Sequence, residues 1–373
     1  MRIALVISSL EGGGAERAMS TIANYWAARD QEVTILTLGS EAGDWYELHP
    51  AVRRVGLNLL SNSAHLGVAL RNNFRRVRRL RRELRKARPD VVISFVDRAN
   101  VLTLLASIGL GVPVIVSERT DPRQHSIGFA LNGLRRWLYP RASAVVMQSR
   151  GLRDWACRFV RDSAIHIIPN PVKPALNGSK YPSSHQDSGR TVVAMGRLGK
   201  EKRFDLLLRA FCRCAKMHDD WSLIILGEGD ERESLEALIG ELELKDRVSL
   251  PGRIRDPAGI LQGADLFVLS SRYEGFPNAL LEAMACGLAV ISTDCGSGPR
   301  EIIRDDVDGL LVPSNDLDAL ATAMERLMAD PAARERLGAH AAEVLERFSM
   351  EKIMSMWDDL LARTCRRKAE ERP

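Results

Sequence analysis

The amino-acid sequence predicts an α/β protein with two domains, each built on a parallel β-sheet. At 373 residues and 41.4 kDa, the chain is long enough for two separate hydrophobic cores. Short apolar runs alternate with helical segments in two blocks, which is the pattern of parallel sheets covered on both faces. Residues 170–189 are rich in Pro, Ser, Gly and Asn and are therefore predicted to link the two blocks.

The first block contains six predicted strands, at residues 3–8, 33–38, 91–95, 112–117, 144–148 and 165–168. The longest uncharged stretch, residues 99–117, contains Gly109, Gly111 and Pro113. A helix, a turn and a strand therefore explain it better than a membrane-spanning helix does.

The second block contains predicted strands at residues 191–195, 221–226, 248–250, 265–269 and 289–293, with helices such as 204–216 and 231–240. Near the end of the chain, residues 350–365 form a helix whose apolar residues recur at helical spacing and indicate one buried face. They are Ile353, Met354, Trp357, Leu360 and Leu361.

Composition indicates a cytosolic globular protein. The hydrophobic content is 45%, and residues 1–8 read directly as a first strand, a run too short for a signal peptide. The six cysteines form no CxxC pair and no zinc-binding pattern, so we expect reduced thiols. Residues 1–170 carry a net charge of +11 and the remainder −6, which indicates that the first domain contacts an anionic partner.

Most of that positive charge lies in residues 71–88, which hold ten cations and one acid, Glu83. Apolar residues at helical spacing place this segment on an amphipathic helix; they are Leu66, Leu70, Phe74, Val77, Leu80 and Leu84. Three interpretations remain open: a solvated helix face, a nucleic-acid contact, and a contact with anionic lipid headgroups or a pyrophosphate-linked lipid. The lipid contact is favoured because no aromatic interleaving accompanies the arginines and because guanidinium groups bind phosphate in a bidentate manner. We assign it to Arg71, Arg75, Arg78, Arg79 and Arg82.

The most informative motif follows the predicted strand at 265–269 and runs from Ser270 to Gly287. Glu274 precedes a helix that starts near Asn278, and Glu282 lies within it. Unpaired N–H groups and the dipole make a helix N-terminus a phosphate site, while glutamates can accept hydrogen bonds from sugar hydroxyls. The motif therefore suits a sugar linked to a diphosphate.

The run from Glu274 to Gly287 resembles the signature of the retaining glycosyltransferases of family 4. This resemblance covers nearly the whole chain and implies the GT-B fold, in which two Rossmann-like domains face each other across a cleft. It implies an acceptor-binding domain over residues 1–172, onto which the C-terminal helix at 350–373 crosses back, and a donor-binding domain over residues 173–349.

The resemblance also implies roles for individual residues. Arg197 and Lys202 match the family's two cations that hold the donor diphosphate, and Glu274 would orient the donor sugar, so these three are the predicted catalytic residues. Fixed cations would stabilise the charge that accumulates on the departing diphosphate. The predicted donor-binding residues are Gly13, Gly14, Arg253, Ile254, Gly275, Phe276, Pro277, Asn278, Ala279 and Glu282, the last on the nucleotide ribose.

On the acceptor side, Glu16 and Arg17 follow a glycine-rich turn and are predicted either to cap the first helix or to contact the acceptor. Many family members carry a histidine on an acceptor-side loop of this domain. This chain has Glu118 and Arg119 in that loop, so the histidine's role cannot be carried over. Further cleft candidates, with those two, are Asp97 and Arg98.

Together these features predict transfer of a sugar from a UDP-sugar to a polyprenyl-diphosphate-linked glycan. The resemblance to family 4 implies that the anomeric configuration is retained. No DxD-like metal motif is apparent, so we expect no metal and no other cofactor. We expect a peripheral position on the inner face of the plasma membrane and no nucleic-acid partner. The alternatives are a nucleotide-sugar epimerase of the GT-B fold, which would need acid/base carboxylates and histidines in the cleft, and a non-catalytic protein that binds membranes or nucleic acid through the arginine-rich helix.

Overall fold

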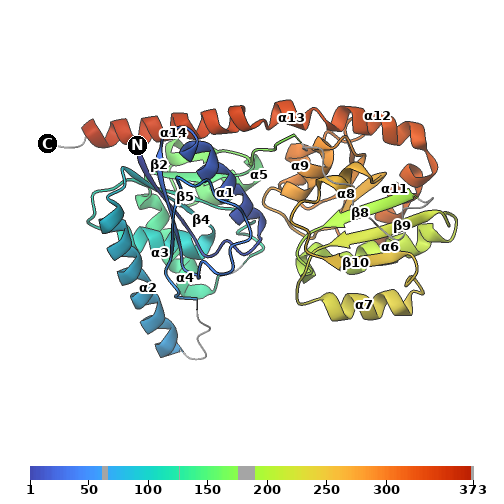
Figure 1. Ribbon diagram of the computed structural model, residues 1–373, viewed down its shortest axis with the longest axis horizontal. Helices are drawn as coiled ribbons and strands as arrows, with labels where there is room; N and C mark the ends of the chain where they lie inside the picture. Colours follow the sequence, from blue (N-terminus) through green and yellow to red (C-terminus); the bar gives the residue numbers. More distant parts are fainter. Residues whose placement is uncertain (61–65, 126, 175–189, 371–373) are drawn as a thin grey trace. The chain divides into compact units, whose positions relative to one another are not determined.

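The computed structural model describes residues 1–60, 66–125, 127–174 and 190–370, and it divides into two compact units (Figure 1). Unit 1 consists of Met1–Asn170 and Ile353–Pro373, and unit 2 of Pro171–Lys352. The domain boundaries predicted from the sequence lie close to these. Most of the predicted linker, residues 175–189, lies outside the described residues.

Unit 1 is built on a seven-stranded, fully parallel sheet with the order β3-β2-β1-β4-β5-β6-β7. Its strands are β1 (Arg2–Ile7), β2 (Glu32–Thr37), β3 (Arg53–Gly56), β4 (Val91–Phe95), β5 (Val114–Ser117), β6 (Ala144–Met147) and β7 (Ile165–Ile167). Its helices are α1 (Gly14–Ala27), α2 (Leu66–Ala87), α3 (Asp97–Ser107), α4 (Phe129–Leu138), α5 (Arg150–Cys157) and most of α14 (Met350–Glu370).

Unit 2 is built on a six-stranded parallel sheet with the order β10-β9-β8-β11-β12-β13. Its strands are β8 (Arg190–Met195), β9 (Trp221–Leu226), β10 (Val248–Gly252), β11 (Leu266–Leu269), β12 (Val290–Asp294) and β13 (Leu310–Pro313). Its helices are α6 (Phe204–Ala215), α7 (Arg232–Glu241), α8 (Ala258–Gln262), α9 (Asn278–Ala285), α10 (Pro299–Ile302), α11 (Leu317–Ala329), α12 (Pro331–Ala341) and α13 (Val344–Arg347).

Both sheets reverse their strand order once, between β1 and β4 in unit 1 and between β8 and β11 in unit 2. The Rossmann-like, doubly wound architecture predicted from the sequence is therefore confirmed for both units. In such sheets, ligands bind outside the carboxyl ends of the strands where the order reverses. The loops after β1, β4, β8 and β11 are thus the first places to look for a site.

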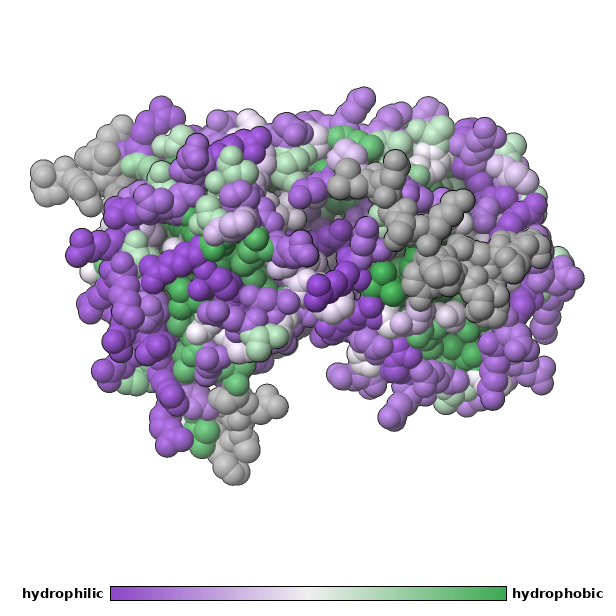
Figure 2. Space-filling view, viewed as in Figure 1, coloured by the Kyte–Doolittle hydropathy of each residue, from purple (hydrophilic) through white to green (hydrophobic). Residues whose placement is uncertain are grey.

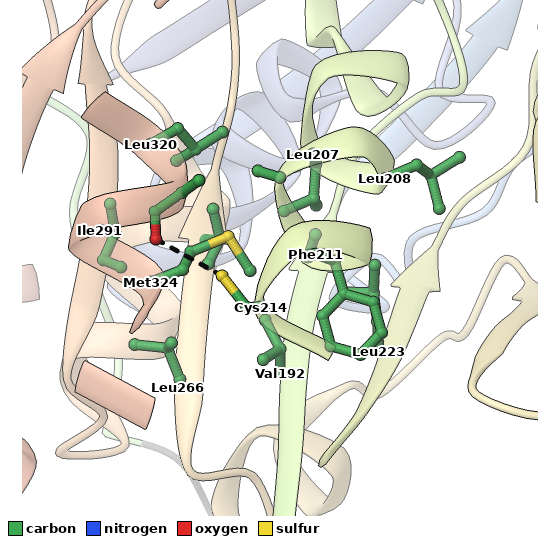
Figure 3. Packing of buried hydrophobic residues seen from close by; sticks show 14 of the residues in the cluster. Val192, Leu207, Leu208, Phe211, Cys214, Leu223, Leu266, Ile291, Leu320 and Met324 are labelled. Carbon is green, nitrogen blue, oxygen red and sulfur yellow. Dashed lines mark hydrogen bonds between the residues drawn. The ribbon is translucent and has the colours of Figure 1, made fainter. Parts of the chain in front are cut away.

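Each unit has its own hydrophobic core, as the chain length predicted. In unit 2, Val192, Leu223 and Leu266 of the sheet pack against apolar side chains of α6 and α11 (Figure 3). The Cys214 thiol lies in this core and donates to the Ala321 carbonyl at 3.4 Å. All six cysteines lie within the described residues, and none of them forms a disulfide there.

The C-terminal helix α14 packs on unit 1, as the resemblance implied, and all five residues of its predicted apolar stripe are buried. The Trp357 ring makes an edge contact with Trp26, with the centroids 6.3 Å apart, and Trp26 Nε1 donates to Asp358 at 2.7 Å. Within the described residues, no helix is long and apolar enough to cross a membrane.

Candidate functional site

The carboxyl edge of the unit 2 sheet is shaped by glycines that let neighbouring strand exits approach closely. A Cβ on Gly227, whose φ is +150°, would lie 1.8 Å from the Gly196 carbonyl oxygen. A Cβ on Gly229 would lie 2.4 Å from the Leu198 carbonyl. The Gly-rich exits after β8 and β9 therefore pack backbone against backbone, and only glycine fits at either position.

Two predicted catalytic residues meet at the point where this sheet reverses its order. Lys202, after β8, places Nζ 2.5 Å from Glu274 Oε1, after β11. Ser271 Oγ donates to the same oxygen at 2.7 Å, and Ser270 Oγ donates to the Lys202 carbonyl at 2.8 Å. The ammonium and the carboxylate are both mostly buried and are held by the serines that begin the motif.

The third predicted catalytic residue, Arg197, lies on the same turn and is 70% exposed. Its Nη2 and Nε donate to Glu201 Oε1 at 2.6 and 3.1 Å. Burial alone would raise the pKa of Glu201, but the hydrogen bonds and charge of Arg197 lower it. Sequence reasoning missed Glu201; its spacing of four residues from Arg197 was the available signal.

The loop from Glu274 to Pro277 is held by contacts with the residues that follow β12. Ser297 Oγ donates to the Glu274 carbonyl at 2.6 Å. Gly298 has a φ of +37°, and a Cβ there would lie 2.9 Å from the Gly275 carbonyl oxygen. Helix α9 then begins at Asn278, with Pro277 as its N-cap.

The other predicted donor-binding residues of unit 2 lie along the same edge. Arg253 is exposed and Ile254 half-buried after β10, and Ala279 and Glu282 lie on α9. Phe276, also predicted to bind the donor, is only 5% exposed, and its ring packs against Phe348 with the centroids 5.4 Å apart.

The glycine-rich loop after β1 is closed by Glu16. The Gly12 and Gly13 N–H groups donate to Glu16 Oε2 at 2.7 and 2.8 Å, and Ser9 Oγ donates to Oε1 at 2.6 Å. Of the two interpretations for Glu16, the structure shows capping of α1. The Gly13 N–H, predicted to cradle the donor, is thus engaged by Glu16; Gly14 and Arg17 begin α1.

At the exit of β4, Asp97 pairs with a histidine that sequence reasoning missed. Asp97 is buried, and its Oδ2 lies 2.9 Å from His125 Nδ1. The preceding residue, Val96, has a φ of +74°, a strained conformation for a β-branched side chain. Hydrogen bonding to Asp97 raises the pKa of His125 even though burial opposes it. The sequence holds no local signal for His125, because it follows the end of β5 by several residues and its partner, Asp97, is 28 positions away.

Glu118 and Arg119, predicted as acceptor-side residues, are buried inside unit 1, which corrects that assignment. Burial raises the pKa of Glu118 to about 7; Tyr139 Oη donates to it at 2.5 Å. Arg119 stacks on Phe95 at 3.5 Å, and burial lowers its pKa to about 9. Its Nη1 donates to Asn170 Oδ1 at 2.5 Å. Both residues therefore expose little surface to an acceptor.

Arg98 differs from these two because it is exposed, at the start of α3. Its charge contributes to lowering the pKa of Arg76 on α2 and opposes protonation of His125. The positive surface of α2 therefore continues, through Arg98, to the carboxyl edge of the sheet.

The arginine-rich segment forms α2, as predicted, but its apolar stripe is only half covered. Leu80 and Leu84 are buried, whereas Leu70 and Phe74 are 67% and 65% exposed. Toward the C-terminal end, the helix and Arg88 line a concave volume of about 830 Å³ with cations alone: Arg78, Arg81, Arg82, Arg85, Lys86 and Arg88. The positions of Arg71, Arg75 and Arg79 are likewise exposed.

The part of the chain with described coordinates holds no group of three or more His, Cys, Asp or Glu residues placed to bind a metal ion.

Comparison with known proteins assigns the family. The profile described as "Glycosyltransferase Family 4" matches residues 12–176, and that described as "Glycosyl transferases group 1" matches residues 180–344. The chain is 39% identical to the lipopolysaccharide core biosynthesis glycosyltransferase LpsD of Rhizobium meliloti, over 76% of this chain and 78% of that one. The chain is a family 4 glycosyltransferase.

The transferase is also similar to two Campylobacter jejuni enzymes. It is 29% identical, over 97% of this chain and 98% of the other, to "GalNAc-alpha-(1->4)-GalNAc-alpha-(1->3)-diNAcBac-PP-undecaprenol alpha-1,4-N-acetyl-D-galactosaminyltransferase". It is 30% identical, over 71% of this chain and 74% of the other, to "N-acetylgalactosamine-N,N'-diacetylbacillosaminyl-diphospho-undecaprenol 4-alpha-N-acetylgalactosaminyltransferase".

Solved structures confirm the GT-B fold of the transferase. Sucrose-phosphate synthase from Thermosynechococcus elongatus matches with a TM-score of 0.81 at 22% identity, over 97% of this chain and 98% of that one. HepE of Anabaena, solved in complex with UDP and glucose, matches with a TM-score of 0.80 at 20% identity, over 97% of this chain and 99% of that one.

Proposed function

We propose that the transferase moves a sugar from a UDP-sugar to a polyprenyl-diphosphate-linked glycan, with retention of configuration and without a metal ion. The observation that carries this proposal is the convergence of Arg197, Lys202 and Glu274 at the order-reversal point of the unit 2 sheet, beside the N-terminus of α9. The acceptor class rests on the two relatives whose names specify undecaprenyl-diphosphate glycans.

The residues at this edge of the unit 2 sheet are suited above all to stabilise the leaving group. Charge accumulates on the departing diphosphate, and an ammonium held in place by Glu274 and a guanidinium oriented by Glu201 require little reorganisation to meet it. Glu274 keeps its second oxygen for a donor hydroxyl, and Glu282 is assigned to the ribose. With two cations and a helix dipole available, no metal is needed to neutralise the diphosphate.

The acceptor side is assigned to the carboxyl edge of the unit 1 sheet. A carboxylate can only accept a hydrogen bond, so Asp97 selects the His125 tautomer with a proton on Nδ1 and a lone pair on Nε2. We assign to that lone pair the hydrogen bond from an acceptor hydroxyl. The proton itself passes to the departing phosphate oxygen as the new bond forms on the same face of the sugar.

Turnover provides the test. UDP-sugars should raise the melting temperature of the protein more than other nucleotide-sugars do, and UDP should be released when a prenyl-diphosphate glycan is added. Proton NMR of the product should show the donor's anomeric configuration. An inverted linkage would rule out retention, and a preference for a non-uridine donor would rule out the donor assignment.

One observation favours the second candidate, a nucleotide-sugar epimerase. The Asp97–His125 pair supplies a histidine and a carboxylate, which such chemistry requires. All the relatives named above are described as glycosyltransferases, which supports transfer. The two functions separate in one assay, because an epimerase converts its nucleotide-sugar with no acceptor present.

A further inference from the structure

The carboxyl-edge end of unit 1 exposes a group of large apolar side chains that the proposed chemistry does not use. Leu60, Leu70, Phe74 and Phe129 are 51%, 67%, 65% and 97% exposed. They are four of the nine large hydrophobic side chains exposed within the described part of the chain. We call this group the apolar tip.

Topology brings these residues to one end of one helical layer. Helix α3 contacts both α2 and α4, so the three helices cover the same face of the sheet. Each starts on the carboxyl side of the sheet, because each follows one parallel strand and leads into the next. Leu60 is fixed at the same edge, since its Cδ1 would lie 3.0 Å from a Cβ on Gly39. The first turns of α2 project beyond the sheet (Figure 1), and hydrophilic side chains lie over much of this helix (Figure 2).

The charge around the apolar tip indicates which partner it contacts. No Asp or Glu occurs between Glu47 and Glu83, or between Asp121 and Asp154. The exposed cations of α2, including Arg71, Arg75 and Arg78, begin within the tip itself. Apolar side chains surrounded by arginines suit a bilayer that contains anionic lipids, in which the chains enter the interface and the guanidinium groups meet phosphates. A symmetric contact with a second copy would instead bring two arginine-rich helices together.

We propose that the apolar tip inserts into the headgroup and acyl boundary of an anionic membrane. One consequence of this insertion, the presentation of the acceptor to the enzyme, rests on the proposed function. Insertion brings the bilayer to the edge that holds Asp97 and His125, so the membrane presents the diphosphate of a prenyl-linked acceptor there. The insertion adds an apolar contribution to binding that salt does not screen, unlike the contribution of the α2 charges.

The test is partition onto vesicles of phosphatidylcholine with a minority of phosphatidylglycerol, measured by co-sedimentation at high salt. Leu70→Gln, Phe74→Gln and Phe129→Gln change only exposed side chains and should leave the melting temperature and its shift by UDP unchanged. Each should lower partition roughly tenfold, because each removes one large apolar side chain from the interface. The matched control is Met217→Gln with Val307→Gln, which removes exposed apolar side chains of unit 2 and should change nothing.

A triple variant combines the three substitutions Leu70→Gln, Phe74→Gln and Phe129→Gln. Equal partition of this triple variant and the wild type at high salt would overturn the proposal. So would a wild-type dimer, detected by light scattering, that the triple variant abolishes, because the tip would then contact a second copy. The proposed function is judged separately, by sugar transfer to a short-chain, water-soluble prenyl-diphosphate acceptor. The triple variant should transfer sugar to that acceptor as fast as the wild type. A wild type that is inactive on every acceptor would refute the proposed function, but the result of the vesicle experiment would still stand.

Discussion

Single side chains at the unit 2 edge are arranged as pairs of opposite charge. Lys202 is paired with Glu274 across two strand exits, and Arg197 with Glu201 along one turn. The sequence motif predicted the cations and Glu274, because glycine-rich strand exits and the Glu-to-Gly run are local signals. It could not predict that Lys202 and Glu274 contact each other, since 72 positions separate them in the chain.

Replacing either cation should slow transfer without unfolding the protein. For Arg197→Ala or Lys202→Ala, the barrier should rise by about 3–4 kcal/mol, a few hundredfold in rate, because the leaving diphosphate loses a fixed positive charge. Lys200→Ala is the matched control, since Lys200 is an exposed cation on the same turn and should retain wild-type turnover. Wild-type turnover in both variants would remove the leaving-group assignment.

The Asp97–His125 pair predicts a pH dependence of acceptor use. Nε2 accepts a hydrogen bond only in neutral imidazole, so kcat/KM for the acceptor should rise with pH through the His125 pKa. Asp97 raises that pKa, while Arg98 lowers it and Glu118 raises it. In Asp97→Asn the acid limb should therefore move to lower pH.

One variant separates His125 from Glu118, whose pKa is about 7. His125→Ala should abolish the acid limb. If Glu118 were the titrating group, the same variant would move the limb upward, because the charge of His125 lowers the pKa of Glu118. His340→Ala is the control, since His340 pairs with Glu343 at 3.0 Å on the surface of unit 2 and should leave the profile unchanged.

At the scale of helices and strands, apolar runs predicted most elements, including the three-residue strand β7, but missed β3, β13 and α4. Strand β3 (Arg53–Gly56) begins with two arginines, and β13 (Leu310–Pro313) has four residues and ends in proline, so neither forms a long apolar run. Helix α4 was also missed, although its Phe129 belongs to the apolar tip. Helix α2 was predicted with its charge, but the sequence could not show which half of its stripe is covered, because that depends on how far the helix extends past the sheet.

The charge of α2 should govern membrane binding at low salt. Replacing Arg75, Arg78, Arg79 and Arg82 with Gln preserves helix propensity and removes four charges, each contributing about 1 kcal/mol near an anionic surface. Partition onto phosphatidylglycerol-containing vesicles should fall by orders of magnitude, and the difference should shrink as salt rises. The same four positions changed to Lys keep the charge and should keep most of the binding. Unchanged partition of the Gln variant would leave α2 as a solvated face.

Helix α14 should contribute strongly to the stability of unit 1. Trp357 is fully buried against Trp26 and Phe95, so Trp357→Ala should lower the free energy of unfolding by about 3–5 kcal/mol, measured by urea denaturation. Trp137→Ala, which removes a 51% exposed indole, should cost far less. Equal losses for the two variants would show that the α14 contact does not stabilise the unit.

At the scale of the whole molecule, the proposed function divides the chemistry between the two units. Unit 2 carries the cations and carboxylates assigned to the donor, and unit 1 carries the histidine, the basic helix and the apolar tip assigned to the acceptor and its membrane. The two-domain architecture could be predicted because strand–helix alternation is repeated across both blocks. The acceptor side could not be predicted to the same depth, since its residues come from loops whose conformation depends on contacts far apart in the sequence.

The most direct test of the account is the mass of the acceptor after reaction. A prenyl-diphosphate glycan is incubated with a UDP-sugar in excess EDTA, and the lipid is analysed by mass spectrometry while UDP is quantified. The account predicts that the acceptor gains the mass of the transferred sugar with one UDP released per sugar added, that Lys200→Ala behaves as wild type, and that Lys202→Ala is slowed a few hundredfold. Release of UDP with free sugar and no gain in acceptor mass, or transfer only after Mn²⁺ or Mg²⁺ is restored, would contradict it.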